Sequence, residues 1–139
     1  MKALSIHAPY ATAIAGNEKT VEVRSWQTKH RGDLLICSSG KIVDGWDRFL
    51  PVGHAIAIVD LTNCRNFTKR DCDAAMISVD EMPKNHYAWI LDNIRPIKPV
   101  KVKGKQRIFD VNIDPEFINI FGDELLNYWL EIGLINRLA

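Results

Sequence analysis

The sequence lacks several features that would each define a class of protein. No apolar run approaches the roughly 18 residues that span a bilayer, so we expect no membrane partner. The three cysteines are an odd number without CxxC spacing, which argues against a disulfide framework. The four histidines have no ligand spacing relative to these cysteines, so we expect no metal and no cofactor. Together these absences favour a cytoplasmic location.

The sequence also lacks a large excess of either charge. It contains 18 basic and 17 acidic residues, for a net charge of +1. This balance argues against a protein that coats long duplex DNA through many phosphate contacts. It is compatible with a local basic patch around a small acidic ligand or a short RNA, and composition does not choose between the two. The length of 139 residues predicts a single domain, residues 1–139, with one core.

Hydrophobic patterning predicts short strands with helices near both ends. Alternating or continuous apolar residues predict strands over 2–7, 20–25, 33–39, 54–61, 87–97 and 108–113. Pro9 near the start and Gly16 at the end predict a short helix between them. Thr68 and Asp71 have capping-box spacing, which predicts a helix start there. Residues 40–53 have no clear period and are expected to form an ordered excursion capped by Trp46, Phe49 and Leu50.

The last part of the chain is predicted to be helical. Asp114 and Pro115 have the pattern of a cap followed by a first-turn proline, with Gly122 closing a short helix. Asp123 can cap a longer helix with an apolar stripe at Leu125, Tyr128, Trp129, Ile132 and Ile135. We therefore expect residues 114–139 to form a helical extension packed on the domain. The elements together predict an α+β, mostly β fold: a small, mostly antiparallel β-barrel with peripheral helices.

The stretch GNEKTVEVRSW, residues 16–26, combines charges with the pattern of a half-buried strand. On a strand, one face carries Thr20, Glu22, Arg24 and Trp26, and the other carries Val21, Val23 and Ser25. We expect the valines to fill the core, with Glu22 and Arg24 about 6 to 7 Å apart on the opposite face. Lys19 at the preceding turn can reach back toward Glu22.

Two interpretations of this charged strand remain open from the pattern alone. The first is a solvated strand face with a weak ion pair, worth about 0 to 1 kcal/mol. The second is a cluster of Lys19, Glu22 and Arg24 that faces a concavity. In that case the guanidinium can grip a phosphate or carboxylate, and Trp26 offers a surface for a nucleobase.

Further basic residues lie in two other segments. Residues 28–32, TKHRG, place Lys29, His30 and Arg31 on the turn after the charged strand. Residues 101–107 carry cations two apart, at Lys101, Lys103, Lys105 and Arg107. This spacing fits a ridge that tracks phosphates and fits equally a soluble edge strand blunted by lysines. Ser38–Lys41, SSGK, lacks the first glycine of a P-loop but can present amides and hydroxyls to an anion.

The first 40 residues resemble the opening of ASCH domains, members of the PUA-like superfamily. The matching positions are Leu4-Ser5-Ile6, Pro9-Tyr10, Gly16, Lys19, Glu22, Arg24-Ser25-Trp26, Arg31-Gly32 and Ser38-Ser39. The segments GHAIAIVDLTNC and YAWILDNIRPI are similar to later barrel strands of the family, so the resemblance covers about residues 2–110. One extra residue lies between Gly16 and Lys19, and His7-Ala8 stands where many relatives carry Arg-Gln or similar.

The resemblance implies a PUA-like β-barrel with a cleft lined by the signature Lys, Glu and Arg, suited to RNA or nucleotides. Some small members are amidohydrolases that deacylate modified cytidine, and some relatives are ribonucleases. The deacylating members use a Lys, a Thr and a Glu. Lys19 aligns with that Lys, but Glu22 stands in place of the Thr and Thr20 does not align, so nucleophilic Thr chemistry does not transfer. Asp60 is a candidate for their later Glu.

Three functional hypotheses follow from the residues and the resemblance. The first is an RNA- or nucleotide-binding domain. In it, Lys19, Arg24 and Arg31 contact phosphate or a base edge, and Trp26 stacks on a base. Glu22 orients the cations and accepts from a base amine, and Ser38 and Ser39 donate hydrogen bonds at the rim of the cleft. The residues of this site are Lys19, Glu22, Arg24, Trp26, Arg31, Ser38 and Ser39.

The second hypothesis is a metal-free hydrolase that acts on an acylated cytidine-type nucleoside or on RNA. Lys19 would serve as base, Glu22 as acid–base partner and Arg24 as oxyanion stabiliser. The third is a protein-interaction domain whose charged face is solvated.

Overall fold

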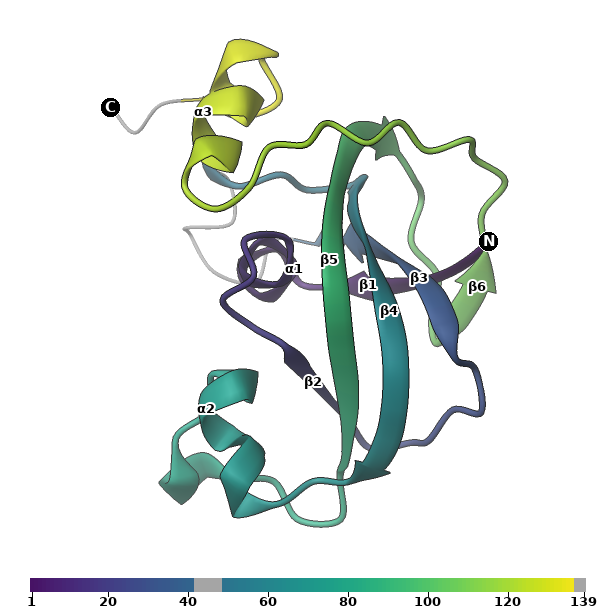
Figure 1. The fold of residues 1–139 in the computed structure, drawn as a ribbon, viewed down its shortest axis with the longest axis vertical. Helices are drawn as coiled ribbons and strands as arrows, with labels where there is room; N and C mark the ends of the chain where they lie inside the picture. The colour runs from purple at the N-terminus through teal and green to yellow at the C-terminus, as the bar shows by residue number, and fades with distance from the viewer. Residues whose placement is uncertain (42–48, 137–139) are drawn as a thin grey trace.

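The computed structural model describes residues 1–41 and 49–136. Within these residues one mixed sheet has the strand order β2-β5-β4-β3-β1-β6. The strands are β1 (Lys2–Ile6), β2 (Val21–Arg24), β3 (Gly32–Ser38), β4 (His54–Asn66), β5 (Tyr87–Lys101) and β6 (Ile108–Asp110). β4 and β5 are much longer than the others and run along the molecule (Figure 1). Trp46, predicted to cap the excursion over residues 40–53, lies outside the described residues.

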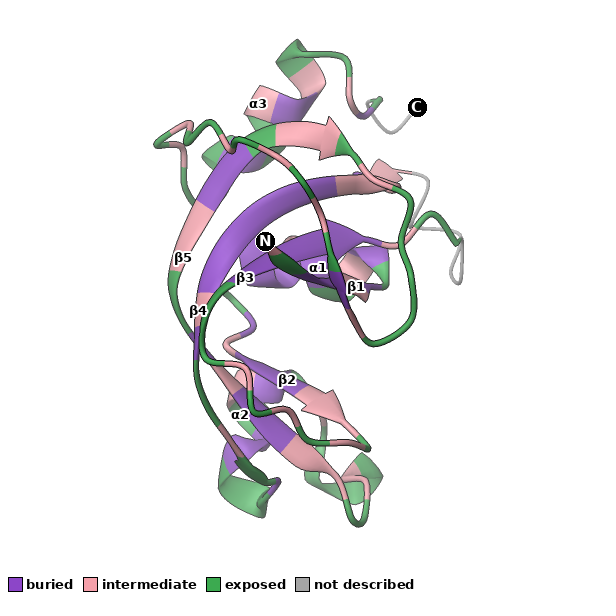
Figure 2. Ribbon diagram, turned by 90° about the vertical axis from the view of Figure 1, so that its right-hand side faces the viewer, coloured by how far each residue is buried: buried purple, intermediate pink, exposed green. Residues whose placement is uncertain are grey.

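The sheet curls into a half-barrel around α1 (Ala8–Ala15), as Figure 2 shows. The predicted α+β fold with a barrel-like sheet and peripheral helices is confirmed. The sheet is mixed, however, because β1 pairs with β3 in parallel while the other strand pairs are antiparallel. Among the described residues β2 and β6 are the sheet edges, and no ladder joins them. β6 pairs only with residues 2–4, so the end of β1 lies open toward β2, and we call this gap the seam.

The main core lies on the concave side of this sheet, under α1. Ala11 and Ile14 of α1 are fully buried with apolar residues of β1, β3, β4 and β5, Trp89 among them. Pro9 lies in the first turn of α1, as predicted. The left-handed residue that ends the helix is Asn17, with φ 62°, whereas Gly16 has a φ of −80°. Asparagine tolerates this conformation better than most side chains, so the turn needs no glycine.

The two valines of β2 pack on the opposite side from Glu22, as predicted, but not in the main core. Val21 and Val23 belong to a separate cluster with Phe67, Cys72 and Ala75, close to α2 (Cys72–Ala75). The expectation that they fill the barrel is therefore wrong. Glu22 pairs with the buried Trp89, so it is Glu22 that faces the concave side of the sheet. Because α2 covers the valine face of β2, these valines are buried outside the main core.

The capping box predicted at Thr68 and Asp71 is confirmed. Both of its hydrogen bonds form, and they begin a 3-10 helix, η2 (Lys69–Asp71), that leads directly into α2. Met76 ends α2 in the left-handed conformation with φ 58°. A second 3-10 turn, η3 (Val79–Glu81), follows before the chain enters β5.

The short helix predicted after Asp114 is wrong. Residues 111–121 contain no helix and run beside β5, where Lys98 N–H donates to Glu116 O and Ile118 N–H donates to Pro96 O. β2 pairs only with Tyr87–Ile90, so the later part of β5 has an unpaired edge on that side. Covering this edge satisfies backbone groups that a local helix would leave open.

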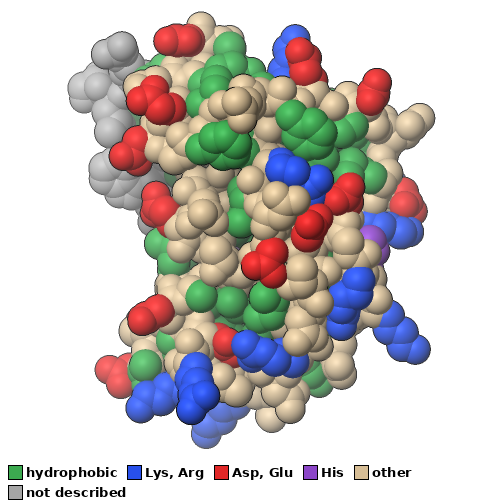
Figure 3. All heavy atoms as spheres, in the orientation of Figure 1, with side chains coloured by type: hydrophobic (Ala, Val, Ile, Leu, Met, Phe, Trp, Pro, Cys, Tyr) green, Lys and Arg blue, Asp and Glu red, His purple; other side chains and the backbone are tan. Residues whose placement is uncertain are grey.

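The longer C-terminal helix is α3 (Glu124–Glu131). Three of the five predicted stripe residues, Leu125, Trp129 and Ile135, are buried in the main core, and Tyr128 is half-buried. Ile132 is 48% exposed because it follows the last helical residue and caps the helix. Of the helices in 1–41 and 49–136, none has the length and apolar content to cross a membrane. Figure 3 shows side chains of both charge signs spread over one face of the molecule.

Candidate nucleotide-binding pocket

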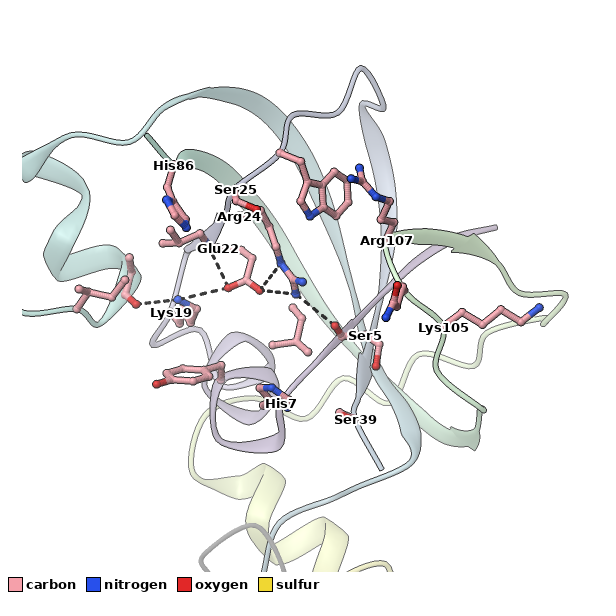
Figure 4. A pocket seen from close by; sticks show the side chains of 17 residues that line it. Ser5, His7, Lys19, Glu22, Arg24, Ser25, Ser39, His86, Lys105 and Arg107 are labelled. Atoms are coloured by element: carbon pink, nitrogen blue, oxygen red, sulfur yellow. Dashed lines mark hydrogen bonds and ion pairs between the residues drawn. The ribbon is translucent and has the colours of Figure 1, made fainter. Parts of the chain in front are cut away.

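A cavity of about 690 Å³ opens at the seam between β2 and β1. Its walls are formed by the end of β1, the start of α1, β2 with the residues that follow it, the end of α2, His86 and residues 105–107. Lys19, Glu22 and Arg24 form a row across it, with His86 and His7 on opposite sides of that row (Figure 4). The predicted cluster of three ionic side chains therefore shares one concavity.

Glu22 is the centre of the row and is only 6% exposed. Its Oε1 accepts a hydrogen bond from Val23 N–H at 3.2 Å and lies 3.6 Å from Lys19 Nζ. Its Oε2 accepts from Arg24 Nε at 3.2 Å and from Arg24 Nη2 at 2.9 Å. Glu22 therefore accepts three hydrogen bonds and makes one ion-pair contact, against the about four acceptor positions that a carboxylate offers. It orients both cations, and its contact with a base amine stays a prediction.

Lys19 is 2% exposed, which is rare for a lysine. Its Nζ donates to the carbonyl of Ala75 at 2.7 Å and lies 5.4 Å from the centre of the Tyr10 ring. Burial lowers the pKa of Lys19 from its ordinary value of 10.5, and the charge of Arg24 adds to this effect while Glu22 opposes it. The turn before β2 therefore places a partly destabilised ammonium group at the wall of the cavity.

Arg24 connects the two sides of the seam. Besides its two bonds to Glu22, its Nη2 donates to the carbonyl of Ser5 on β1 at 3.2 Å. Its Nη1 group makes no hydrogen bond to any residue in 1–41 or 49–136. Arg24 lines the cavity and its side chain is 25% exposed, so two N–H donors remain for a ligand.

Trp26 lies at the rim, but its ring is not open on both faces. It meets Trp89 edge to face, with 4.8 Å between ring centroids. The Arg107 guanidinium carbon lies over the ring at 4.9 Å from its centroid. Arg107, which the sequence indicated only as part of a basic ridge, therefore lies over one face of the ring on which we expected a base to stack.

The remaining predicted site residues divide into two groups. Ser39 lines the cavity. Ser38 does not, because it is buried and its hydroxyl donates to His54 O and accepts from His54 N–H. Arg31 also lies outside, exposed, with its Nη1 donating to the carbonyls of Thr28 and His30. Asp60 is not a second carboxylate of this site, because it lies outside the cavity and pairs with Arg95 at 2.7 Å.

Several residues of the cavity were not predicted as site residues. Those with polar side chains, apart from the basic ridge, are Ser5, His7, Tyr10, Ser25, His86 and Gln106. The first four lie in the family-like opening segment, so the resemblance was the only signal that pointed near them. His86 and the Ala75 carbonyl come from the loop and helix around η3 and α2, and no local pattern indicates that these segments reach the mouth of the seam.

Comparison with known proteins identifies the same family as the sequence motifs do. The ASCH domain profile matches residues 4–101. Activating signal cointegrator 1 from Mus musculus is 50% identical over 38 residues, which are 27% of this chain but 6% of that protein. The chain therefore spans only a small part of that curated relative.

Solved structures of ASCH from Zymomonas mobilis have the same fold. One has a TM-score of 0.63 and 16% identity, covering 99% of this chain and 97% of that one. A point mutant has a TM-score of 0.62 and 18% identity, covering 80% of this chain and 89% of that one. The profile covers well over half of the sequence, and it includes Lys19, Glu22 and Arg24. The chain belongs to the ASCH domain family.

Proposed function

We propose that the seam cavity binds RNA or a nucleotide through the ligand's hydrogen-bond acceptors. The observation that carries this proposal is the imbalance of hydrogen-bonding groups around the row. The Glu22 carboxylate already accepts three hydrogen bonds and faces the Lys19 ammonium group, whereas Arg24 Nη1 keeps two donors. Arg107 adds a second guanidinium at the rim. Phosphate oxygens and base carbonyls are acceptors that match such a surface.

The size of the cavity supports a ligand of nucleotide class. At about 690 Å³ it falls within the roughly 300–1,000 Å³ range of small-molecule sites. Three serine hydroxyls, from Ser5, Ser25 and Ser39, lie at its wall and can donate to or accept from sugar and base groups. Glu22 holds Lys19 and Arg24 in place before binding, so the ligand does not have to order these two side chains.

Arg107 is the residue on which we expect a base to stack. Single-stranded bases stack on guanidinium planes as well as on aromatic rings, and a guanidinium braced by an indole is pre-ordered for this purpose. Trp26 then acts by positioning Arg107, and this replaces direct stacking on the indole. In this arrangement Arg107 contacts the base, and Arg24 donates hydrogen bonds to the ligand's phosphate or carbonyl oxygens.

Titration of a fluorescently labelled single-stranded RNA of about six nucleotides, followed by anisotropy, tests the proposal. We expect Arg107→Asn to weaken binding about tenfold, the scale of one lost stacking contact. Asparagine is the suitable replacement because Arg107 has a φ of 59°, which asparagine tolerates and alanine does not. Lys98→Gln is the matched control, since it removes an exposed cation outside the cavity.

The proposal is contradicted if the RNA does not bind, or if Arg107→Asn and Lys98→Gln change its affinity equally. Binding that is indifferent to salt also contradicts it, because phosphate contacts release counterions.

A second candidate is hydrolysis at the same cavity, supported by one observation. Burial lowers the pKa of Lys19, and a lowered pKa makes the neutral amine that a general base needs easier to form. Incubation with an acylated cytidine and with single-stranded RNA tests this function, with Lys19→Met as the variant. Turnover must be present and must be lost in the variant, and equal turnover by Lys19→Met contradicts a catalytic role.

The charged strand does not support the hypothesis of a protein-interaction domain. It required the charged side chains to point into solvent without a shared concavity. Lys19 and Glu22 are instead both buried and line one cavity with Arg24.

A further inference from the structure

A second groove adjoins the seam cavity, and we call it the lysine groove. It has a volume of about 650 Å³ and carries three lysines: Lys101 at the end of β5, and Lys103 and Lys105 on the segment between β5 and β6. It shares Ser5, Ser39, Lys105 and Gln106 with the seam cavity, so the two hollows lie side by side. In Figure 4 the side chain of Lys105 extends away from the row of Lys19, Glu22 and Arg24. The groove therefore continues outward from the proposed binding site.

The charges of the lysine groove are not neutralised by the described part of the protein. None of its described lining residues is acidic. Lys101, Lys103 and Lys105 form no ion pair with a residue in 1–41 or 49–136. By contrast, Lys2 and Lys98, exposed elsewhere, each pair with a carboxylate. A run of unpaired cations beside small side chains leaves both charge and space for an anionic chain.

Gly104 fixes this segment close to the edge of the seam cavity. A Cβ at Gly104 would lie 2.6 Å from Ser5 Oγ and 3.1 Å from Ser5 Cβ, so only glycine fits there without a shift. Val102 N–H donates to Gly53 O, which holds the other end of the segment against the chain that enters β4. The lysines are therefore presented from a segment tied down at two points.

We propose that the lysine groove holds the phosphodiester backbone next to the nucleotide in the seam cavity. The ligand is then a single-stranded polynucleotide, and a free nucleoside or mononucleotide fills only half of the site. This inference rests on the proposed function of the seam cavity. The recognised chemistry is the phosphodiester, which RNA and DNA share.

The test compares two ligands and two pairs of substitutions. The ligands are uridine 5′-monophosphate and a single-stranded uridine RNA of about six nucleotides, each titrated over a range of salt concentrations. The variant Lys101→Gln with Lys103→Gln removes two charges from the groove. The control Lys69→Gln with Lys98→Gln removes two exposed lysines that line neither hollow. Circular dichroism melts confirm that both variants remain folded.

We expect the groove variant to weaken binding of the RNA and leave binding of the monophosphate unchanged. Loss of two phosphate contacts lowers the slope of log affinity against log salt by about 1.4 for a single strand. The same shift with a thymidine DNA strand of equal length supports the inference, because phosphate is the shared group.

The inference is overturned if the groove variant and the control behave alike toward the RNA, or if affinity for the monophosphate falls in parallel. Arg107→Asn separates this failure from failure of the cavity itself. If Arg107→Asn weakens both ligands while the groove variant affects neither, the groove proposal fails and the cavity proposal stands. If Arg107→Asn affects neither ligand, the cavity proposal fails.

Discussion

The Glu22–Arg24 pair and the Asp71–Arg65 pair contain the same kinds of group at nearly the same distance but have different surroundings. Their shortest N–O distances are 2.9 Å and 2.7 Å, and both carboxylates are buried. Arg65 grips Asp71 with two parallel bonds and is 44% exposed, outside the seam cavity. Arg24 binds Glu22, crosses the seam to Ser5 and keeps two donors in the cavity.

This difference separates an ion pair that stabilises the fold from one that can also serve a ligand. Asp71 uses its carboxylate to cap η2, accepting from the N–H and hydroxyl of Thr68. Glu22 uses its carboxylate to hold two cations, one of which is the buried Lys19. Proximity of opposite charges is common to both, so it does not identify a site. The proposed binding site rests instead on the donors that Arg24 keeps inside the cavity.

The largest expected effect comes from removing the carboxylate of each pair. Glu22→Ala leaves Lys19 and Arg24 without their anion inside the protein, and we expect a loss of about 3–5 kcal/mol in the free energy of unfolding. Asp71→Ala should cost less, because Arg65 can turn to water. Urea denaturation of both variants measures the difference. A loss below about 1 kcal/mol for Glu22→Ala would mean that the row is not held as described.

Exchanging the arginine of each pair for lysine tests which of the two pairs affects RNA binding. Lysine keeps the charge but loses the planar fork, so Arg24→Lys removes the spare Nη1 donors and the bond to Ser5. We expect RNA affinity to fall about tenfold or more, as for a lost hydrogen bond to a charged group. Arg65→Lys should leave RNA affinity unchanged and cost about 1 kcal/mol of stability or less. Equal losses of affinity in the two variants would contradict the division of roles.

The smallest expected effect is the pH dependence of the Asp71 pair. Hydrogen bonding to Arg65, with the Thr68 backbone assisting, lowers the pKa of Asp71 from 3.8 to about 2. Because the pKa is lower in the folded state, the ionised Asp71 stabilises the fold fully at any pH above the pKa of the unfolded state. This stabilisation is lost as the pH falls from about 4 toward 2. We expect this contribution to be about 1–2 kcal/mol, reduced by the water around Arg65.

Urea midpoints between pH 6 and pH 2 measure this dependence, with Asp71→Asn as the variant that lacks it. The wild-type protein should lose more stability on acidification than the variant does. Identical pH profiles for the two proteins would show that Asp71 does not titrate with a lowered pKa.

Features encoded within a few residues were predicted well from the sequence. The alternation of Glu22 and Arg24 with Val21 and Val23 placed the charges on one face of a strand, and Thr68 with Asp71 marked a helix start. Both depend on local geometry, the two-residue period of a strand and the four-residue span of a capping box. The stripe of α3 was found for the same reason, and it failed only at Ile132, just past the helix end.

Features that depend on distant partners were not predicted. Residues 111–121 have a good helix-start pattern, but their backbone forms hydrogen bonds with the unpaired edge of β5 and no helix forms. The valines of β2 face α2 because a helix from another part of the chain covers that side. The Ala75 carbonyl that holds Lys19, and Arg107 over Trp26, are contacts between segments separated by more than 50 residues. No local pattern encodes such contacts.

The most direct test of the seam cavity as the binding site is the response of the tryptophan indole N–H signals to RNA in a proton–nitrogen NMR spectrum. Trp26→Phe assigns the Trp26 signal by its disappearance, and Trp129, buried in the main core, serves as internal reference. The account predicts that the Trp26 signal moves progressively and saturates with binding, since Arg107 over its ring contacts the base, while the Trp129 signal stays in place. Saturable RNA binding with an unmoved Trp26 signal would contradict it.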